Sequence, residues 1–269
     1  MSTALARLFH VDAFTTVPFA GNAAGVVVLD AATPEAWMQA VAAELQQSET
    51  AFVVPADNGF AIRWFTPAVE VELCGHATLA AAHVLWDEGL VAATQPITLA
   101  SASGPLTCTR LDDGAIRLDF PIDVPRPCEA PPGLIEALSV PVLAVERGRF
   151  DYLIQVADEA TVRALHPDLQ RLVEVETRGV CVTAPADTDG LDFVSRFFAP
   201  RIGIAEDPVT GSVHCMLAPY WAARLGRDEL RAAQRSARGG ELRVRVQGER
   251  VELVGHAVTV TRGTIALPA

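Results

Sequence analysis

Two glycine-containing turns carry residue types that could bind an anion. Residues 74–76 (CGH) open an alanine-rich stretch, and residues 207–212 (DPVTGS) open a second apolar stretch. If both stretches are helices, the N–H groups of their first turns lack partners, and the helix macrodipole adds about half a positive charge there. Donors fixed in this way stabilise a carboxylate, or the enolate-like charge that forms when a proton leaves the carbon beside a carbonyl group.

The glycines of these turns also have a simpler explanation. Gly75 and Gly211 could serve only the backbone geometry of a turn. Both occur at the same place in two similar stretches of chain, and we therefore favour a role in binding.

Glu49 is the candidate acid/base. It follows a helical pattern over residues 36–47 and precedes an apolar strand pattern. Its carboxyl group could therefore be desolvated, with a pKa raised to about 6 or 7, which suits proton transfer near neutrality. On this context alone a solvated glutamate at a helix end is the better explanation, since most glutamates are surface residues.

Composition limits the class of protein. The 269 residues, half of them hydrophobic, indicate a compact chain with about two domains. The formal net charge of -12 argues against nucleic acid as a partner but permits a small anionic metabolite, because local donors can outweigh a distant, screened charge.

No apolar stretch could span a bilayer and the first ten residues lack the features of a signal peptide, so we expect no membrane partner and a cytoplasmic location. The five cysteines include no CxxC pair, which predicts reduced thiols rather than a disulfide framework.

The chain contains two copies of one pattern. Residues 49–67 and 176–200 both read Glu-Thr, an apolar strand, Pro-Ala-Asp, a glycine turn, a second strand with Arg and two aromatics, and a proline. A helical pattern precedes each copy, at 36–47 and 161–172, and an apolar helix follows each. Many short strands with few helices predict the α+β class, as two lobes that each wrap a sheet around one long helix.

The predicted lobes have a boundary near residue 118. Residues 1–118 form the N-terminal lobe, joined by a last strand at 258–269, and residues 119–257 form the C-terminal lobe, with the proline-rich stretch 121–133 as the link. Duplicated halves create a pseudo-twofold cleft, and small-molecule sites favour such interfaces.

Four stretches in combination resemble the PhzF family of phenazine-biosynthesis isomerase-like proteins, within the diaminopimelate epimerase-like fold. They read VDAFTTVPFAGNAAGVV (11–27), QSETAFV (47–53), ELCGHATLA (72–80) and AEDPVTGSV (205–213). The resemblance covers most of the chain. It implies two pseudo-symmetric lobes, each a barrel-like sheet around a central helix, with the active site between them, no metal or other cofactor, and a homodimer.

The resemblance also assigns roles by position. Glu49 matches the family's acid/base, His76 a histidine that assists proton transfer, and Asp207 an aspartate of the site. The family's substrate-binding turns match residues Gly75, Thr210, Gly211 and Ser212 of this chain. Asn22 matches a further residue that contacts the substrate. His76 and Asp207 could instead be helix-capping or structural residues.

Several rival interpretations use the same residues. Cys74 stands where thiol-dependent racemases of the wider fold have a base, but the second lobe offers Asp207-Pro208 at the corresponding turn and no cysteine. A hydrolase built on Ser212 lacks the G-x-S-x-G elbow, and a zinc site from Cys74, His76, His214 and Cys215 lacks the usual ligand spacing. The protein could also bind a metabolite without catalysis.

A single acid/base most naturally removes and returns a proton on one face of its substrate. We therefore predict a cofactor-independent isomerase that catalyses a tautomerisation or allylic hydrogen shift on a small carboxylated metabolite, in a biosynthetic process. The alternatives are a racemase or epimerase that uses Cys74, and a non-catalytic binding protein.

Overall fold

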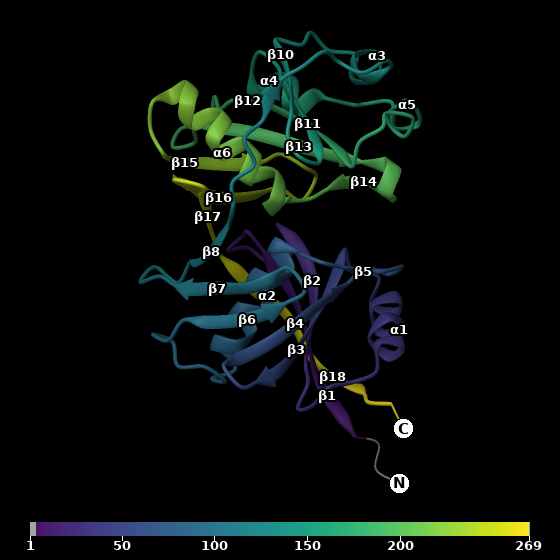
Figure 1. Ribbon diagram of the computed structural model, residues 1–269, viewed down its shortest axis with the longest axis vertical. Coiled ribbons are helices and arrows are strands. Elements are labelled where there is room, and N and C mark those ends of the chain that lie inside the picture. Colours follow the sequence, from purple (N-terminus) through teal and green to yellow (C-terminus); the bar gives the residue numbers. More distant parts are fainter. Residues whose placement is uncertain (1–3, 269) are drawn as a thin grey trace. The chain divides into compact units, whose positions relative to one another are not determined.

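The structure is a computed structural model that describes residues 4–268 (Figure 1). The chain divides into two compact units, of which the first contains the residues up to Asp119 and those from Val254 onward. The second unit is Phe120–Leu253. Each unit is a mixed sheet with few helices, as predicted for the α+β class.

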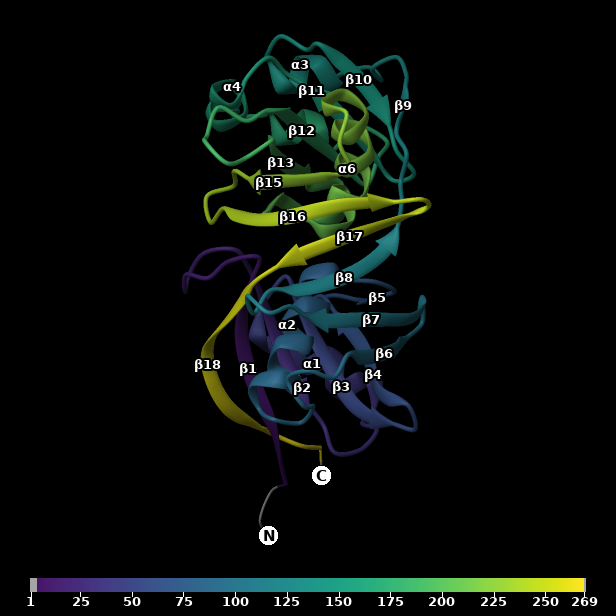
Figure 2. The same cartoon turned by 90° about the vertical axis from the view of Figure 1, so that its left-hand side faces the viewer.

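The first unit contains two helices, eight complete strands and parts of two more. Its helices are α1 (Glu35–Leu45) and α2 (Gly75–Asp87). Its strands are β1 (Leu5–Ala13), β2 (Asn22–Val28), β3 (Glu49–Ala56), β4 (Gly59–Phe65), β5 (Glu70–Val71), β6 (Ile97–Ser101), β7 (Gly104–Arg110), β8 (Ile116–Pro121), β18 (Ala257–Ala266) and the end of β17 (Arg250–Gly255). The strand β18 lies along β1 as an antiparallel partner (Figure 2).

The second unit carries four α-helices and a short 3-10 helix. The helices are α3 (Leu134–Leu138), α4 (Glu159–Ala164), α5 (Leu169–Leu172), η1 (Pro200–Ile202) and α6 (Gly211–Leu225). The strands are β9 (Arg126–Pro127), β10 (Ala144–Arg147), β11 (Asp151–Gln155), β12 (Gly179–Pro185), β13 (Phe193–Ala199), β14 (Ile204–Asp207), β15 (Glu229–Gln234), β16 (Gly240–Gln247) and the start of β17.

The two units share one strand topology. In the first, β2 pairs in parallel with β3, β3 is antiparallel to β4, and β4 pairs with the short antiparallel β5 and the parallel β6. In the second, β11, β12, β13, β14 and β15 repeat the same order and directions. The internal similarity seen in the sequence is therefore a duplication of the sheet.

In each unit a mostly buried helix lies against one face of the sheet. The helix α2 buries ten residues, including every residue from His76 to Ala82, and its alanines let neighbouring strands approach closely. The opposite face of the strands is covered by α1, whose Met38 and Val41 pack with Phe52 and Phe65. Both faces of β3 are thus buried, which explains its nearly continuous apolar sequence.

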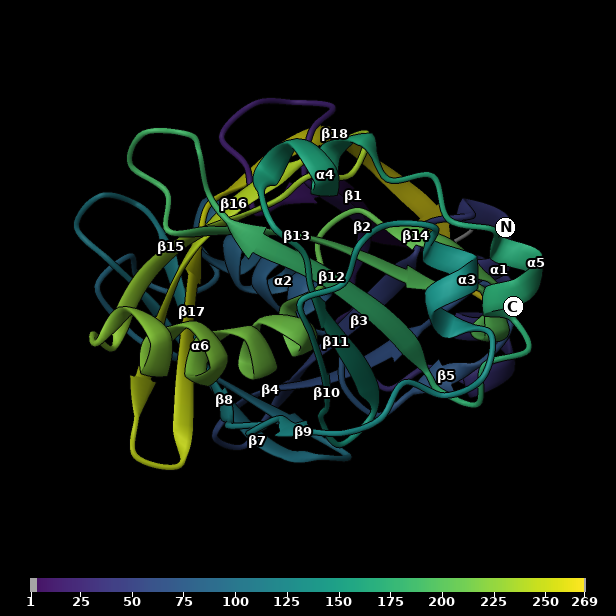
Figure 3. The ribbon, with the colours of Figure 1, turned by 90° about the horizontal axis from the view of Figure 1, so that it is seen from above.

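The second unit has the same layers. Val180 and Val182 of β12 pack with residues of α3, α4 and α5, whereas Thr183, on the other face of the strand, accepts a hydrogen bond from the Trp221 side chain of α6. Figure 3 shows α6 and the three short helices around strands β11 to β13. The side chains of β12 alternate between two covered faces, as the period of a strand requires.

One predicted helix is broken. The pattern over residues 161–172 forms two short helices, α4 and α5, instead of one. Pro167 lies between them, has no N–H for a helical hydrogen bond, and disfavours helical backbone at the residue before it. The Asp168 side chain then caps α5 by accepting from the N–H groups of Gln170 and Arg171. Within residues 4–268, none of the helices has both the length and the apolar character needed to cross a bilayer.

Candidate active site

In the first unit, three element ends bring Asn22, Glu49 and His76 together. Asn22 is the first residue of β2 and Glu49 the first of β3, and the parallel register places Ala24 opposite Glu49. His76 lies in the first turn of α2, directly after Gly75. Parallel strands begin at the same edge of a sheet, so residues distant in sequence meet at this edge.

The His76 imidazole is the centre of this group. Its Nε2 lies 3.3 Å from Oε2 of Glu49. Its Nδ1 lies 3.3 Å from the side-chain nitrogen of Asn22 and 3.5 Å from Sγ of Cys74. The His76 side chain is 6% exposed and that of Glu49 is 14% exposed, so the carboxylate has limited access to water.

These contacts select one tautomer of His76. The Asn22 amide nitrogen can only donate, so Nδ1 is the acceptor and Nε2 carries the hydrogen. The contact between Nε2 and Glu49 has ion-pair distance but not the alignment of a hydrogen bond, and Nε2 is a buried donor without a hydrogen-bond acceptor. Such a donor is available to a substrate atom or to proton exchange with Glu49.

Burial keeps His76 neutral. It lowers the pKa of this imidazole to about 4, and the carboxylate of Glu49, which would act in the opposite direction, does not reverse that shift. The group at neutral pH is therefore a neutral imidazole beside a carboxyl group, and His76 acts as a hydrogen-bond donor rather than as a cation.

In the second unit, Asp207, Thr210, Gly211 and Ser212 form one rigid turn. Asp207 ends β14 and Thr210 is the N-cap of α6. The Thr210 hydroxyl donates to Oδ2 of Asp207 over 2.5 Å, and the Thr210 N–H donates to the side-chain oxygen of Gln234 over 2.9 Å. Both donors of Thr210 thus serve the turn itself, so Thr210 positions its neighbours.

Free donors remain at the start of α6. Among residues 4–268, no protein acceptor takes the backbone N–H groups of Gly211 and Ser212. The Gln234 side-chain nitrogen donates to the Asp207 carbonyl over 2.6 Å and holds this turn in place. The start of α6 therefore presents uncommitted backbone donors, the arrangement that the predicted anion-binding role requires.

Arg178 is a member of this second group that sequence reasoning missed. Its Nε donates to Oδ1 of the buried Asp151 over 2.9 Å, and its Nη2 donates to the other Asp151 oxygen and to Oγ of Ser212, the latter over 3.0 Å. Burial acts to lower the pKa of Arg178, but the bond to Asp151 outweighs it and raises that pKa, so the guanidinium stays charged. The rings of Phe150 and Phe197 lie 5.1 and 5.8 Å from the guanidinium carbon.

The Arg178 side chain is fixed but not covered. It is 32% exposed, whereas its partner Asp151 is 3% exposed, and Nη1 has no hydrogen-bond acceptor in the described chain. The signal in the sequence was a charged residue at the start of an otherwise apolar strand. A local sequence pattern cannot identify the ion-pair partner of Arg178, because Asp151 lies on the neighbouring strand, β11.

The strand register corrects the alignment of the two sequence copies. Thr50 of β3 pairs with Phe65, and Val180 of β12 pairs with Phe198, so the counterpart of Glu49 is Gly179. The Glu176 that matched Glu49 in the sequence lies three residues earlier and is exposed. The second unit therefore has no carboxylate at the position of Glu49.

The helix starts do match as predicted. Cys74 and Thr210 are the two N-cap residues, and Gly75 and Gly211 the first helical residues. The fourth residue of each helix bonds to the N-cap carbonyl, through the Thr78 hydroxyl over 2.6 Å and through the His214 Nδ1 over 2.8 Å. The residue equivalent to Cys74 is thus a threonine, not a second thiol.

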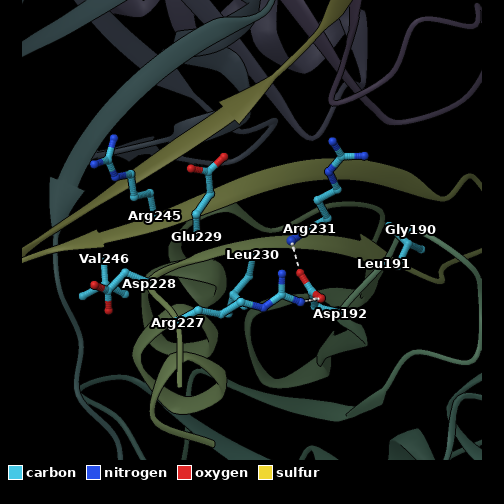
Figure 4. Close-up of a pocket in the computed structure, with 10 residues that line it drawn as sticks. All are labelled: Gly190, Leu191, Asp192, Arg227, Asp228, Glu229, Leu230, Arg231, Arg245 and Val246. Carbon is cyan, nitrogen blue, oxygen red and sulfur yellow. Dashed lines mark hydrogen bonds and ion pairs between the residues drawn. The ribbon is translucent and has the colours of Figure 1, made fainter. Parts of the chain in front are cut away.

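A separate cavity lies in the second unit. It has a volume of about 780 Å³ and is lined by ten residues from the loop before β13, the turn before β15, and the strands β15 and β16 (Figure 4). Arg227 and Asp192 form an ion pair there, and Asp192 also accepts from the Arg231 N–H over 2.7 Å. None of the predicted site residues lines this cavity.

Comparisons with known proteins agree with the fold and the motifs. The family model of phenazine biosynthesis-like proteins (PhzC-PhzF) matches residues 11–263. The chain is 46% identical over 261 residues to a protein of Halalkalibacterium halodurans named as an uncharacterized isomerase, covering 97% of this chain and 98% of that protein. It superimposes on the crystal structure of a PhzF-family phenazine biosynthesis protein of Enterococcus faecalis with a TM-score of 0.93 and 42% identity, covering 98% and 100% of the two chains.

A more distant likeness concerns the fold alone. A probable proline racemase of Agrobacterium radiobacter has a TM-score of 0.66 at 15% identity, over 98% of this chain and 93% of that one. The diaminopimelate epimerase-like fold expected from the sequence is confirmed. On the family match and the sequence identity together, this chain belongs to the PhzC-PhzF family of phenazine biosynthesis-like proteins.

Proposed function

We propose that the protein is an isomerase that moves a proton between two carbons of a small carboxylated metabolite, with Glu49 as the acid/base. The observation that carries the proposal is the 3.3 Å contact between Glu49 and Nε2 of a neutral His76 in a mostly buried site. The isomerase names of relatives support the reaction class.

The proposed reaction needs only groups of the chain. The Glu49 carboxylate takes a proton from a carbon of the substrate and becomes a carboxylic acid, and the electron pair left behind delocalises toward the substrate's carbonyl or conjugated acid. Nε2–H of His76 and the free N–H groups at the start of α2 stabilise that charge. Glu49 then returns the proton to another carbon on the same face, so the substrate changes only in the place of one hydrogen and its double bond.

The second group is proposed to bind the substrate. Gly211 and Ser212 offer backbone donors, and Arg178 offers the uncommitted Nη1 of a fixed guanidinium, which suits the planar geometry of a carboxylate. Asp207 is proposed to accept a hydrogen bond from the substrate or share its proton, held in place by Thr210.

The asymmetry of the two units supports a single base. Racemisation by two thiols requires one base for each face, yet the counterpart of Cys74 is Thr210 and the counterpart of Glu49 is Gly179. Cys215 lies within α6, buried, with its Sγ 3.7 Å from the Gly211 carbonyl oxygen. A racemase that uses Cys74 remains the second candidate, because its Sγ lies 3.5 Å from Nδ1 of His76.

A deuterium-exchange experiment tests the proposal. The protein is incubated in deuterium oxide with a panel of small unsaturated and cyclic carboxylic acids, and incorporation at carbon is followed by NMR. Glu49→Gln is expected to slow incorporation by about 10²–10⁴-fold. Glu176→Gln, at the exposed glutamate that matches Glu49 in sequence only, is the control and should exchange at the native rate.

The same assay separates the rivals. Cys74→Ser should retain exchange, whereas a thiol-dependent racemase should lose it. A binding protein without catalysis should shift its thermal midpoint with a ligand but exchange no proton. Equal exchange by the native protein and Glu49→Gln would remove Glu49 from the mechanism.

A further inference from the structure

Cys74 lies beside Glu49 and His76, and the proposed proton transfer does not use its thiol. A carboxylate oxygen of Glu49, Sγ of Cys74 and a ring nitrogen of His76 all lie within 4.8 Å of one another. Cys74 is 7% exposed and His76 is 5% exposed. Three different ligand types thus converge in a site largely withdrawn from water.

We propose that Glu49, Cys74 and His76 bind a zinc ion, and that zinc at this site inhibits the enzyme reversibly. The inhibitory part rests on the proposed function, because it requires Glu49 to be the acid/base. The binding part rests only on the ligand geometry.

The ligand set selects the class of metal. A thiolate and an imidazole favour zinc or a similar borderline-soft cation, whereas magnesium and calcium prefer oxygen ligands alone. Three protein ligands and one open position is a common arrangement for zinc at a reactive site. The ligand spacing in the sequence disfavours a zinc site from Cys74, His76, His214 and Cys215, whereas the cluster in the structure combines Cys74 and His76 with Glu49.

The spacing is close to that of a tetrahedral site. Bond lengths of about 2.0–2.3 Å to zinc place neighbouring ligand atoms about 3.3–3.8 Å apart. Nε2 of His76 and a carboxylate oxygen of Glu49 are already 3.3 Å apart. Sγ of Cys74 lies 3.5 Å from the other nitrogen of the ring, within a cluster whose ligand atoms are all within 4.8 Å, so a movement of the short Cys74 side chain has to complete the set.

The imidazole must change its tautomer to bind the ion. Nε2 carries the hydrogen in the metal-free site, and as zinc binds Nε2 the hydrogen moves to Nδ1, where the side-chain oxygen of Asn22 can accept it once the amide turns. The Cys74 thiol loses its proton to solvent as the thiolate binds. One proton is released for each ion, so the affinity should rise about tenfold for each pH unit below the thiol pKa.

Zinc at this site would hold the carboxylate of Glu49 as a ligand. A carboxylate bound to a metal is a weaker base and cannot approach the carbon from which it must take a proton. Removal of the ion by a chelator should restore the free carboxylate and the activity.

Cobalt(II) titration of the metal-free, full-length protein tests the binding. A cobalt–thiolate bond gives a charge-transfer absorption in the near ultraviolet, and we expect this band to saturate at one ion per chain. Cys74→Ser should lose the band, with Cys74→Ala as the alternative if the serine variant does not fold. Cys128→Ser, which removes the exposed thiol, is the matched control and should keep it. Glu49→Gln should keep the band with an affinity at least about tenfold lower.

Two results would overturn the site: no band in the native protein, or a band that survives the loss of Cys74. A second arm measures deuterium exchange with added zinc and then with a chelator. Loss of exchange with zinc and recovery with chelator is expected, and exchange unaffected by saturating zinc would overturn the inhibition. Exchange that is abolished by the chelator alone would instead contradict the metal-independent function, while the cobalt band would still report on the site.

Discussion

Nε2 of His76 lies 3.3 Å from a carboxylate oxygen of Glu49, and the opposite nitrogen of the same ring faces the Asn22 amide. The two relationships are coupled, because the hydrogen bond at one nitrogen of an imidazole fixes which nitrogen carries the hydrogen. Asn22 therefore acts as a positioning residue for the proton on the side of Glu49.

Asn22→Asp should reverse this arrangement. A carboxylate at Nδ1 accepts instead of donating, so Nδ1 becomes protonated, Nε2 loses its hydrogen, and the pKa of His76 rises from about 4 toward its ordinary value. The nitrogen chemical shifts of the ring, followed by NMR against pH, check this directly. Deuterium exchange should fall by at least about tenfold, and an unchanged ring titration would refute the assigned tautomer.

Two buried histidines should make stability depend on pH. Burial lowers the pKa of both His76 and His214 to about 4, whereas the unfolded chain protonates near 6.5. The unfolded state then binds more protons between these values, so stability is complete above about pH 6.5 and falls as the pH drops toward 4. Each histidine contributes on the order of 3 kcal/mol over the full range.

Urea unfolding between pH 7 and 4.5 measures this loss, in a range that lies above most carboxylate titrations. His214→Gln should reduce the slope of unfolding free energy against pH by about half, since His214 is one of two such groups. His166→Gln is the control, because the His166 side chain is exposed, and its slope should match the native one.

Arg178→Lys should weaken substrate binding. A lysine cannot bond Asp151 through two nitrogens while also reaching Ser212, so the carboxylate of Asp151 loses its bidentate partner and the substrate loses a fixed donor. We expect KM to rise about tenfold or more, with a smaller change in kcat. Arg171→Lys, in an exposed ion pair, should leave KM unchanged. A loss confined to kcat would instead place Arg178 among the groups that act on the transition state.

Gly179→Ala should destabilise the fold. A Cβ at this position would overlap the ring of Phe197, so either the ring or β12 must move, at a cost of about 1–3 kcal/mol in unfolding free energy. Gly263→Ala adds a methyl group to open space in β18 and serves as the control. Equal unfolding midpoints for the two variants would contradict the tight packing at Gly179.

The sequence by itself determined the family, the fold class and the local elements. The turns at 74–76 and 207–212 do open helices, because small residues and an apolar run in helical spacing specify a buried helix locally. Glu49 does begin a strand. The motifs also single out Asn22, Glu49 and His76.

Only the tertiary structure decided which residues touch. The pairing of β11 with β12 brings Asp151 to Arg178, and the register of β12 with β13 puts Gly179, not Glu176, at the position of Glu49. Register depends on which strands pair and on what covers their faces, and a repeated Glu-Thr in the sequence carries no information about either. The neutral state of His76 likewise follows from its burial. That burial depends on how the sheet closes over α2, and the sequence next to His76 does not determine it.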